Sequence, residues 1–408
     1  MSGIPAGYKQ TEVGVIPEDW SCNTVDQLVN DSILAKPLDG NHGNIHPKSG
    51  DFVSHGIPFV MANNVRDGCV DLTNCAFIRK EQADSLQKGF SLPGDVLLTH
   101  KATIGQTAIV GDVPYEYIML TPQVTYYRVI DGERLNNEYL RQYFEGANFQ
   151  RVLQSLSGGG TRSYIGITAQ RELPVVVPSS VLEQRAIAAA LSDVDALLAK
   201  LDQLIAKKRD LKQAAMQQLL TGQTRLPGFS GAWEETTFDS VVRHHSGNST
   251  LIKGKLLSVE TTGAFPAYSA SGQDVWCDHY EYEGTAIIVS AVGSRCGKAF
   301  QATDKWCAIA NTHVVWPISA KIDMNFLGFY INDEEFWLKS GSGQPFVLFK
   351  QTFARRLLLP NIEEQTAIAT ALSDMDAELA ALEARRDKTR ALKQGMLQEL
   401  LTGRIRLV

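Results

Sequence analysis

The sequence lacks the features that mark a membrane, secreted or strongly basic protein. No run approaches the roughly 18 apolar residues that cross a membrane, and the opening MSGIPAGYKQTEVG lacks the basic start and apolar core of a signal peptide. Six cysteines are scattered without a CxxC pair, which is typical of a reducing cytosol. Lysine and arginine number 39 against 45 aspartates and glutamates, so charge alone disfavours a dedicated nucleic-acid binder. We expect a cytoplasmic chain with no membrane partner.

Signatures of several common enzyme classes are also missing. GSRCGKA at Gly293 has one residue too few between its glycines for a Walker A loop, and SGSGQ lacks the setting of a nucleophile elbow. We find neither a Rossmann glycine loop with the amide-proline-aromatic tetrad of a methyltransferase nor the acidic pair and lysine of a magnesium nuclease. His244, His245, Cys277 and His279 have no second ligand pair at metal spacing. The sequence therefore predicts a non-catalytic chain without a metal site or cofactor of its own.

One long segment is present twice. EQRAIAAALSDVDALLAKL begins at Glu183, and EQTAIATALSDMDAELAAL begins at Glu364. From there to Leu226 and Leu407 the residue numbers differ by 181 without a gap, and about 26 of 44 positions are identical. Both copies close with LKQ, QxLLTG and RL. The chain therefore contains an internal duplication.

Each copy predicts a long helix with a coiled-coil seam. No proline interrupts either copy, and Gly222 and Gly403 stand where a C-cap is expected. About 40 residues at 1.5 Å each would make a rod of roughly 60 Å. Apolar residues step by four and three along both copies, at Ile187, Leu191, Val194, Leu198, Leu201 and at Ile368, Leu372, Met375, Leu379, Leu382. Past the middle we expect the first seam to shift by one position, to Leu204, Lys208, Leu211 and Ala215.

The charge pattern favours antiparallel pairing of the two helices. Acidic residues load the first half of each copy, at Glu183, Asp193, Asp195 and at Glu363, Glu364, Asp374, Asp376. Basic residues load the second half, at Lys207, Lys208, Arg209, Lys212 and at Lys388, Arg390, Lys393. Antiparallel pairing sets acid beside base, whereas parallel pairing sets like beside like. These charges also complement each helix dipole, but the dipole does not account for two matched seams.

A fainter repeat frames the blocks that precede the helices. Trp20 stands five residues before Val25, and Trp233 stands five residues before Phe238. Both blocks contain many short strand-like runs, and GDVLLTHKATIGQ resembles GTAIIVSAVGSRCGK. We predict an α/β (α+β) chain in which two globular domains are joined by two long antiparallel helices with pseudo-two-fold symmetry. The expected segments are 1–175, 176–224, 225–358 and 359–408.

Polar loops after the predicted strands are candidates for DNA contact. Arg, Lys, Asn and Gln read base edges, while hydroxyls, cations and glycine-rich turns hold phosphates. Each of these side chains could equally be a solvated turn residue, but together they form two matched sets. The first block offers Asn63, Asn64, Arg66, Thr99, His100, Lys101, Thr103, Thr161, Arg162, Ser163 and Tyr164. The second offers Ser269, Ser271, Gln273, Ser294, Arg295, Lys298, Thr312, His313, Ser342, Gln344 and Lys350.

The chain resembles specificity subunits of type I restriction-modification systems. The residues that carry the resemblance are GYKQTEVGVIPEDW, PGDVLLTHKATIG, SGSGQP and both EQxAIAxALSDxDA…LKQ…QxLLTG segments, in order along essentially the whole chain. One departure is that Arg385-Arg386 stand where the first copy has Leu204-Ile205, so contacts in the middle of the helices cannot be fully symmetric.

The resemblance implies two target-recognition domains that each read one half of a split site in double-stranded DNA. It also implies a helical spacer that docks two modification (methyltransferase) subunits. S-adenosylmethionine would belong to those subunits, and ATP, magnesium, translocation and cleavage to the partner machinery that includes restriction subunits. Two other interpretations stay open. The chain could be a scaffold that binds proteins or peptides without DNA, or an enzyme with an unfamiliar site.

Overall fold

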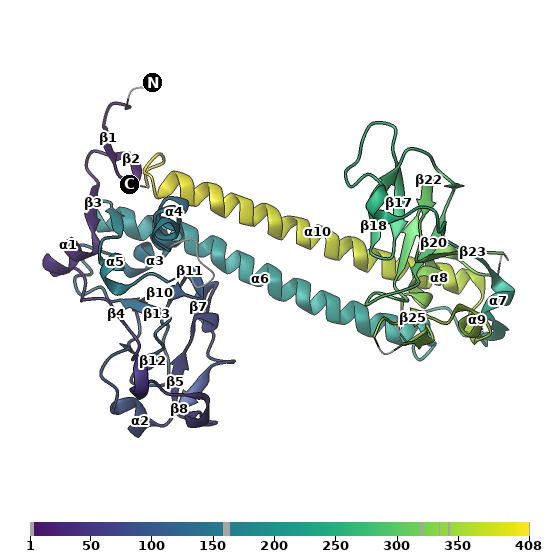
Figure 1. Cartoon of the computed structure of the whole chain (residues 1–408), viewed down its shortest axis with the longest axis horizontal. Helices are drawn as coiled ribbons and strands as arrows, with labels where there is room; N and C mark the ends of the chain where they lie inside the picture. Colours follow the sequence, from purple (N-terminus) through teal and green to yellow (C-terminus); the bar gives the residue numbers. More distant parts are fainter. Residues whose placement is uncertain (1–3, 158–163, 319–320, 334, 342, 408) are drawn as a thin grey trace. The chain divides into compact units, whose positions relative to one another are not determined.

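The computed structural model describes residues 4–157, 164–318, 321–333, 335–341 and 343–407 (Figure 1). The chain divides into two compact units: unit 1 comprises Met1–Asp202 and Ala384–Val408, and unit 2 comprises Gln203–Glu383. The long helices α6 (Val181–Leu220) and α10 (Ile362–Leu400) each contribute one half to each unit. The units therefore cut across both helices, and the four-segment division expected from the sequence stays a prediction.

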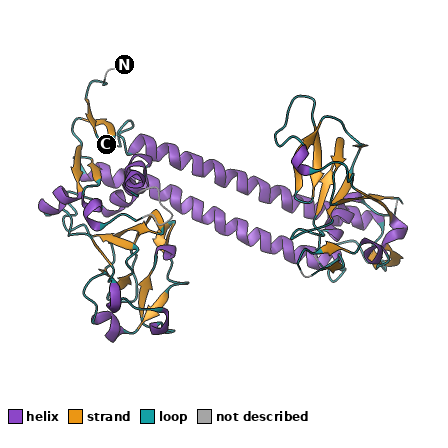
Figure 2. Ribbon diagram, viewed as in Figure 1, coloured by secondary structure: helices purple, strands orange, loops and turns teal. Residues whose placement is uncertain are grey.

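Unit 1 contains two main sheets (Figure 2). The larger has the order β4-β13-β10-β11-β7-β6, with β4 Leu38–Asp39, β6 Val65–Arg66, β7 Gly68–Val70, β10 Val96–Lys101, β11 Thr103–Ile109 and β13 Val124–Tyr127. The smaller has the order β8-β5-β12-β9, with β5 Ile57–Val60, β8 Ala76–Ile78, β9 Phe90–Ser91 and β12 Ile118–Leu120. Strand β10 is paired on both sides and is buried up to His100, so its exposed end is Lys101.

Smaller elements complete unit 1. The hairpin of β1 (Tyr8–Thr11) and β2 (Gly14–Pro17) precedes β3 (Ser21–Thr24), which pairs with β14 (Pro174–Val177) at the start of α6. Helix α1 begins with a capping box in which Thr24 and Gln27 satisfy each other's backbone N–H groups. The short helices are α1 Val25–Asn30, α2 Lys80–Asp84, α3 Asn137–Glu145, α4 Ala147–Leu156 and α5 Ile167–Arg171, with 3₁₀ turns η1 Gly43–Ile45, η2 Ser49–Asp51 and η3 Ala62–Asn64.

Unit 2 is built from the corresponding elements. One sheet has the order β16-β23-β20-β21, with β16 Val242–Ser246, β20 Ala286–Ser290, β21 Ala299–Ala302 and β23 Thr312–Pro317. The other has the order β18-β17-β22-β19, with β17 Phe265–Ser269, β18 Gly272–Cys277, β19 Tyr282–Glu283 and β22 Lys305–Ala308. The remaining elements are β15 Glu234–Thr237, α7 Phe238–Val241, η4 Lys253–Lys255, α8 Met324–Ile331, β24 Lys339–Ser340, β25 Phe346–Val347, α9 Phe349–Phe353 and β26 Arg356–Leu359.

The two units share one topology. The order β16-β23-β20-β21 repeats β4-β13-β10-β11, and β18-β17-β22-β19 repeats β8-β5-β12-β9. The parallel pairing of β5 with β12 recurs between β17 and β22, and the pair β3–β14 recurs as β15–β26. The resemblance between GDVLLTHKATIGQ and GTAIIVSAVGSRCGK therefore reflects equivalent elements, β10–β11 and β20–β21.

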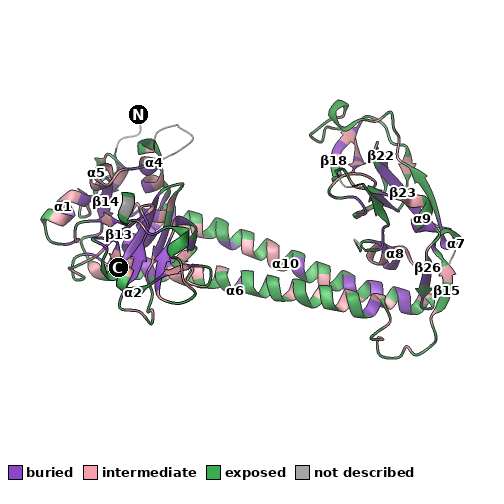
Figure 3. Ribbon diagram, turned by 60° about the horizontal axis from the view of Figure 1, so that its bottom comes forward, coloured by how far each residue is buried: buried purple, intermediate pink, exposed green. Residues whose placement is uncertain are grey.

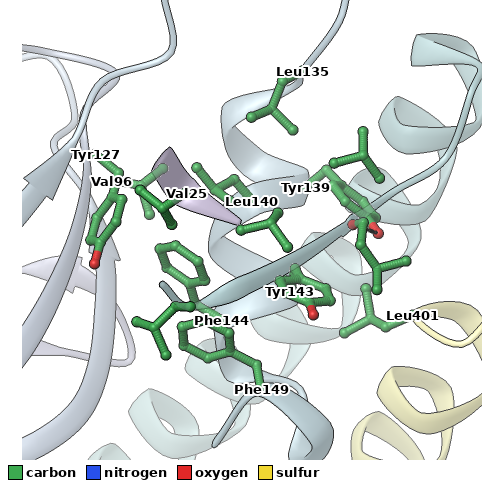
Figure 4. Packing of buried hydrophobic residues seen from close by; sticks show 14 of the residues in the cluster. Val25, Val96, Tyr127, Leu135, Tyr139, Leu140, Tyr143, Phe144, Phe149 and Leu401 are labelled. Carbon is green, nitrogen blue, oxygen red and sulfur yellow. Dashed lines mark hydrogen bonds between the residues drawn. The ribbon is translucent and has the colours of Figure 1, made fainter. Parts of the chain in front are cut away.

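The core of unit 1 shows how the helices are held. Tyr139 and Tyr143 on α3, together with Phe144 and Phe149, lie in one buried cluster with Leu401, which follows α10 (Figure 4). The first turns of α6 and the last turns of α10 join this cluster through Ile187, Ala188, Leu191, Leu397 and Leu400. In unit 2 the opposite ends meet, because Leu219 of α6 lies in a cluster with Ile368, Ala369 and Leu372 of α10. The helices are therefore antiparallel within each unit, as predicted.

The predicted seam is present, but its shift is not. Along both helices, buried and half-buried positions alternate with exposed ones (Figure 3). All ten predicted seam residues are buried or half-buried. Ile205 is 2% exposed, whereas Leu204 and Leu211 are 39% and 47% exposed. The expected shift by one position is wrong, because the four-three spacing continues through Ile205, Lys208, Lys212, Ala215 and Leu219.

Ion pairs between the helices follow the duplication. In unit 2, Lys212 lies 2.5 Å from Asp376, and in unit 1 the equivalent Lys393 lies 2.6 Å from Asp195. Arg209 pairs with Glu383 in unit 2, and the equivalent Arg390 pairs with Asp202 in unit 1 at 3.2 Å. Acid in the first half of one helix thus meets base in the second half of the other.

The words EQ and RL at the two ends of each copy have a joint role. Glu183 and Glu364 are each 1% exposed. The guanidinium of Arg406 donates to Glu183 and lies over the ring of Trp20, while that of Arg225 donates to Glu364 and lies over Trp233. The Glu183 bond, and then that to Asp19, raises the pKa of Arg406. We call each of these groups, Arg406 with Glu183 and Trp20 or Arg225 with Glu364 and Trp233, a clasp. Each clasp ties the end of one helix to the start of the other within its unit.

Candidate nucleic-acid interface

In unit 1 the predicted loop residues gather at the end of β10. Ala102 has a φ of 67°, a left-handed backbone that allows the tight turn between Lys101 and Thr103. Ile165 donates to the His100 carbonyl at 3.0 Å, which places Tyr164 beside the turn, and the Lys101 Nζ lies 5.9 Å from the Tyr164 ring. The structure thus brings together the exposed Lys101, Thr103 and Tyr164. Thr161, Arg162 and Ser163 lie outside the described residues.

His100 lies beneath this turn and is fully buried. Its Nδ1 bonds the Ile165 carbonyl at 2.9 Å, and its Nε2, 4.0 Å from Asp39, has no hydrogen-bond partner. Burial lowers the pKa of His100 to about 4, although the nearby Asp39 acts to raise it. Burial by itself would raise the pKa of Asp39, but hydrogen bonds from Lys88 and His42 outweigh it and hold that pKa low. Near pH 7 His100 is therefore neutral, and the neighbouring Asp39 is ionised.

In unit 2 the equivalent loops also meet. The loop after β20 is held to the glycine-serine segment, since Gly293 donates to the Pro345 carbonyl at 2.8 Å and Val347 donates to the Ala291 carbonyl at 2.9 Å. From the same loop, Arg295 donates to the Ser271 carbonyl at 2.9 Å. Side chains of this set that are exposed are Ser271, Gln273, Ser294, Arg295, Lys298, Gln344 and Lys350. Ser342 lies outside the described residues.

Six of the predicted contact residues are buried. They are Asn64, Thr99, His100, Ser269, Thr312 and His313. The Asn64 amide donates to the carbonyls of Asp71 and Asn74, and the Thr99 hydroxyl accepts from the Gln106 N–H. The Ser269 hydroxyl accepts from the Ser271 N–H, and Thr312 donates to a backbone carbonyl. These six side chains do not reach the surface, and the polar groups of Asn64, Thr99, Ser269 and Thr312 hold the loops in shape, so a part for the six in DNA binding stays a prediction.

His313 belongs to a stacked group of rings that the sequence pattern does not indicate. Its Nε2 lies 2.7 Å from the Nδ1 of His244, and the two rings stack on Phe349 and Phe353 at 3.8 and 3.7 Å. Burial, with smaller effects from His244 and His245, lowers the pKa of His313 to about 3. One imidazole therefore donates to the other while both are neutral. The pairing register of β16 with β23 brings His244 and His313 together, and sequence alone does not give that register.

The remaining predicted residues of unit 1 are Asn63 and Arg66, both exposed. Arg66 forms an ion pair with Asp71. Because the Arg66 side chain is 58% exposed, this pair is weak, and a phosphate could take the place of the Asp71 carboxylate. Within the part of the chain that the structure describes, no group of three or more His, Cys, Asp or Glu residues is placed to hold a metal ion. No helix among those residues is long and apolar enough to cross a membrane.

Comparisons with known proteins agree with this architecture. The family model of the type I restriction modification DNA specificity domain matches residues 41–207 and again residues 232–390. A Methanocaldococcus jannaschii protein provisionally named the type I restriction enzyme MjaX specificity subunit is 22% identical over 98% of this chain and 97% of its own length. The MjaVIII specificity subunit of the same organism is 23% identical over 54% of this chain and 49% of its own length.

A solved structure shares the fold. The S subunit of a type I restriction-modification system from M. genitalium aligns with a TM-score of 0.60 and 16% identity, over 93% of this chain and 96% of that one. The family model covers most of the chain in two matched copies, one for each recognition block. The chain therefore belongs to the family of type I restriction modification DNA specificity domains, and it is a specificity subunit of such a system.

Proposed function

We propose that each unit reads one half of an asymmetric, bipartite site in double-stranded DNA. The observation that carries this proposal is the repetition of one strand order with different loops at the same place. Lys101, Thr103 and Tyr164 lie in the loops of unit 1, and Ser294, Arg295 and Gln344 lie in the corresponding loops of unit 2. Because cations and amides at such loops contact phosphates and base edges, unlike loops on like frames would read unlike half-sites. The residues named above as exposed are the contact set of this proposal.

The paired helices would set the distance between half-sites and dock two modification subunits. Leu197, Leu204 and Leu211 are exposed and follow one another at seven-residue intervals along α6. Their equivalents on α10 are Glu378, Arg385 and Leu392, so the two helices offer different surfaces to partners. A seven-residue apolar spacing fits a partner helix. S-adenosylmethionine would act in the modification subunits, with ATP and magnesium in the restriction subunits, and this chain would carry out no catalysis.

Exchange of one block tests this proposal. Residues 30–170 are replaced by the corresponding block of a relative, and the methylation motif of the assembled complex is read by methylome sequencing. We expect one half-site to change while the other half-site and the spacer stay the same. A change in both half-sites would contradict the division of labour between the units.

The rival interpretation, a scaffold that binds proteins without DNA, is separated by a binding assay. The assembled complex is titrated with duplexes of varied sequence, and Arg295→Ala and Lys101→Ala are compared with the wild type. The proposal expects sequence-dependent binding that both variants weaken while subunit assembly stays intact. Binding that ignores sequence would favour the scaffold, and the isolated chain should show no methylation, hydrolysis or cleavage.

A further inference from the structure

Unit 1 contains a hollow beside the β10–β11 turn, and Lys101 is the member of the contact set above that lines it. Its volume is about 430 Å³. Three stretches form its walls: the segment that carries η1 and η2, the end of β5, and the turn between β12 and β13. The polar lining comprises His42, His46, Lys48, Ser49, Lys101, Thr121 and Gln123. We call this hollow the cationic notch.

The charge of the cationic notch is of one sign. None of its lining residues is an aspartate or glutamate. Neither Lys48 nor Lys101 forms an ion pair with any described residue, in contrast to Lys88, whose charge is taken up by Asp39. Two carboxylates contact residues of the lining: Asp39 lies 2.6 Å from the His42 ring, and an Asp51 oxygen accepts from the Lys48 backbone N–H. Two lysines that line one hollow and form no ion pair among the described residues attract an anion.

Buried polar atoms in the cationic notch also have no partner. Thr121 is 3% exposed, and its hydroxyl forms no hydrogen bond; the Nδ1 of His46 is likewise buried and unpaired. Such atoms are costly unless something binds them. Burial lowers the pKa of His46, and the charges of His42, Lys101 and Lys48 lower it further against the effect of a backbone hydrogen bond. The charges of these side chains therefore act on the His46 imidazole, which lines the cationic notch.

We infer that the cationic notch binds one phosphodiester group of the DNA backbone. A phosphate accepts from the Lys48 and Lys101 ammonium groups and from the Thr121 hydroxyl at once, and so satisfies both the free charge and the orphaned donor. Unit 2 has Ala291 where unit 1 has Lys101, so this lysine of the notch has no counterpart there. This inference rests on the proposed reading of DNA and adds a fixed anchor on the unit 1 side.

The salt dependence of binding tests the anchor. Lys48→Met, Lys101→Met and the double variant are assembled with their modification subunits, and Kd is measured against salt for the cognate and an unrelated duplex. We expect the double variant to weaken both duplexes by the same factor, at least tenfold, and to lower the slope of log K against log salt by about 0.9. Lys9→Met is the matched control, because Lys9 lies on the β1–β2 hairpin and donates to the Glu18 carbonyl.

A neutral backbone analogue locates the contact. Duplexes with a single methylphosphonate at each position in turn should reveal one phosphate whose neutralisation weakens wild-type binding, and the double variant should lose that sensitivity. Lys48→Arg with Lys101→Arg should restore the slope, and Thr121→Val should weaken binding without changing it. An unchanged slope would overturn the inference. A relaxed base preference with the slope intact would also overturn it, by assigning the notch to a base edge. If the wild-type complex showed no sequence-specific binding, this result would instead count against the proposed function.

Discussion

Unit 1 and unit 2 share a strand order and a helix clasp but differ in how the clasp is covered. In unit 1, Val13 and Ile16 of the β1–β2 hairpin are buried against the end of α10, and Val176 on β14 is 1% exposed. In unit 2, residues 223–233 form no strand, and Leu358, the equivalent of Val176, is 53% exposed. The corresponding hollows measure about 190 and 1040 Å³. The duplication has kept the ionic framework and changed the apolar cover.

The tryptophans of the two clasps differ in the same way. Trp20 is fully buried, and its Nε1 donates to Glu183 at 3.3 Å. Trp233 is half-buried, and its Nε1 has no partner. The comparison teaches that equivalent residues carry unequal shares of stability, which three pairs of substitutions can measure.

The largest difference is expected between Trp20→Ala and Trp233→Ala. Removal of a fully buried tryptophan costs about 3–5 kcal/mol, because it loses apolar burial and leaves a cavity. Trp233 already faces an open hollow, so its loss should cost about half as much. Amide exchange in α3 and α8 reports the two effects separately. Equal costs would mean that the hairpin contributes nothing to the burial of Trp20.

A smaller difference is expected between Glu364→Gln and Glu183→Gln. Arg225 has Glu364 as its carboxylate, so the first substitution leaves its charge beside the Gly231 carbonyl and the Trp233 ring, with no carboxylate partner among the described residues. Arg406 keeps Asp19 at 2.8 Å after the second. We expect Glu364→Gln to destabilise unit 2 by about 2 kcal/mol and Glu183→Gln to destabilise unit 1 by about half that amount. Reversal of this order in denaturant titrations would show that Asp19 does not compensate.

The smallest losses of stability are expected from substitutions at Val176 on β14 and at the equivalent Leu358 on β26. Val176→Ala removes a side chain that is 1% exposed and should cost about 1–2 kcal/mol, whereas Leu358→Ala should stay within about 0.5 kcal/mol. The thermal unfolding midpoint of each variant is the measurement. A large loss from Leu358→Ala would mean that unit 2 covers this position in solution.

The sequence predicted the helix pair because the evidence for it is local and doubled. Two matched seams and opposite charge blocks allow few other arrangements, and the clasps, ion pairs and core clusters follow from them. The shifted seam failed because it placed Leu204 and Leu211 at positions that Ile205 and Lys212 occupy in the structure. Lys212 stays on the seam by pairing with Asp376, and Lys208, which was predicted there, pairs with Glu378.

The candidate site was harder to predict in detail. The loops themselves were found, since a strand followed by glycine and polar residues is visible in sequence. The sequence does not show which of their side chains face outward. The reason is that β10 and β23 are central strands and lack the alternation of apolar and polar residues that separates inner from outer positions. Thr99 and His313 thus looked like surface residues. The cationic notch was missed because its walls come from segments that are distant in the chain.

The clasps and ion pairs have a consequence for how this chain can evolve. Each joins a position in the first copy to a position in the second, and the reverse bond also exists, which is the pattern of an isologous interface between identical subunits. A substitution at one of these positions therefore removes a partner from a residue in the opposite copy. The two halves of the gene must drift together at these positions, while their recognition blocks are free to diverge.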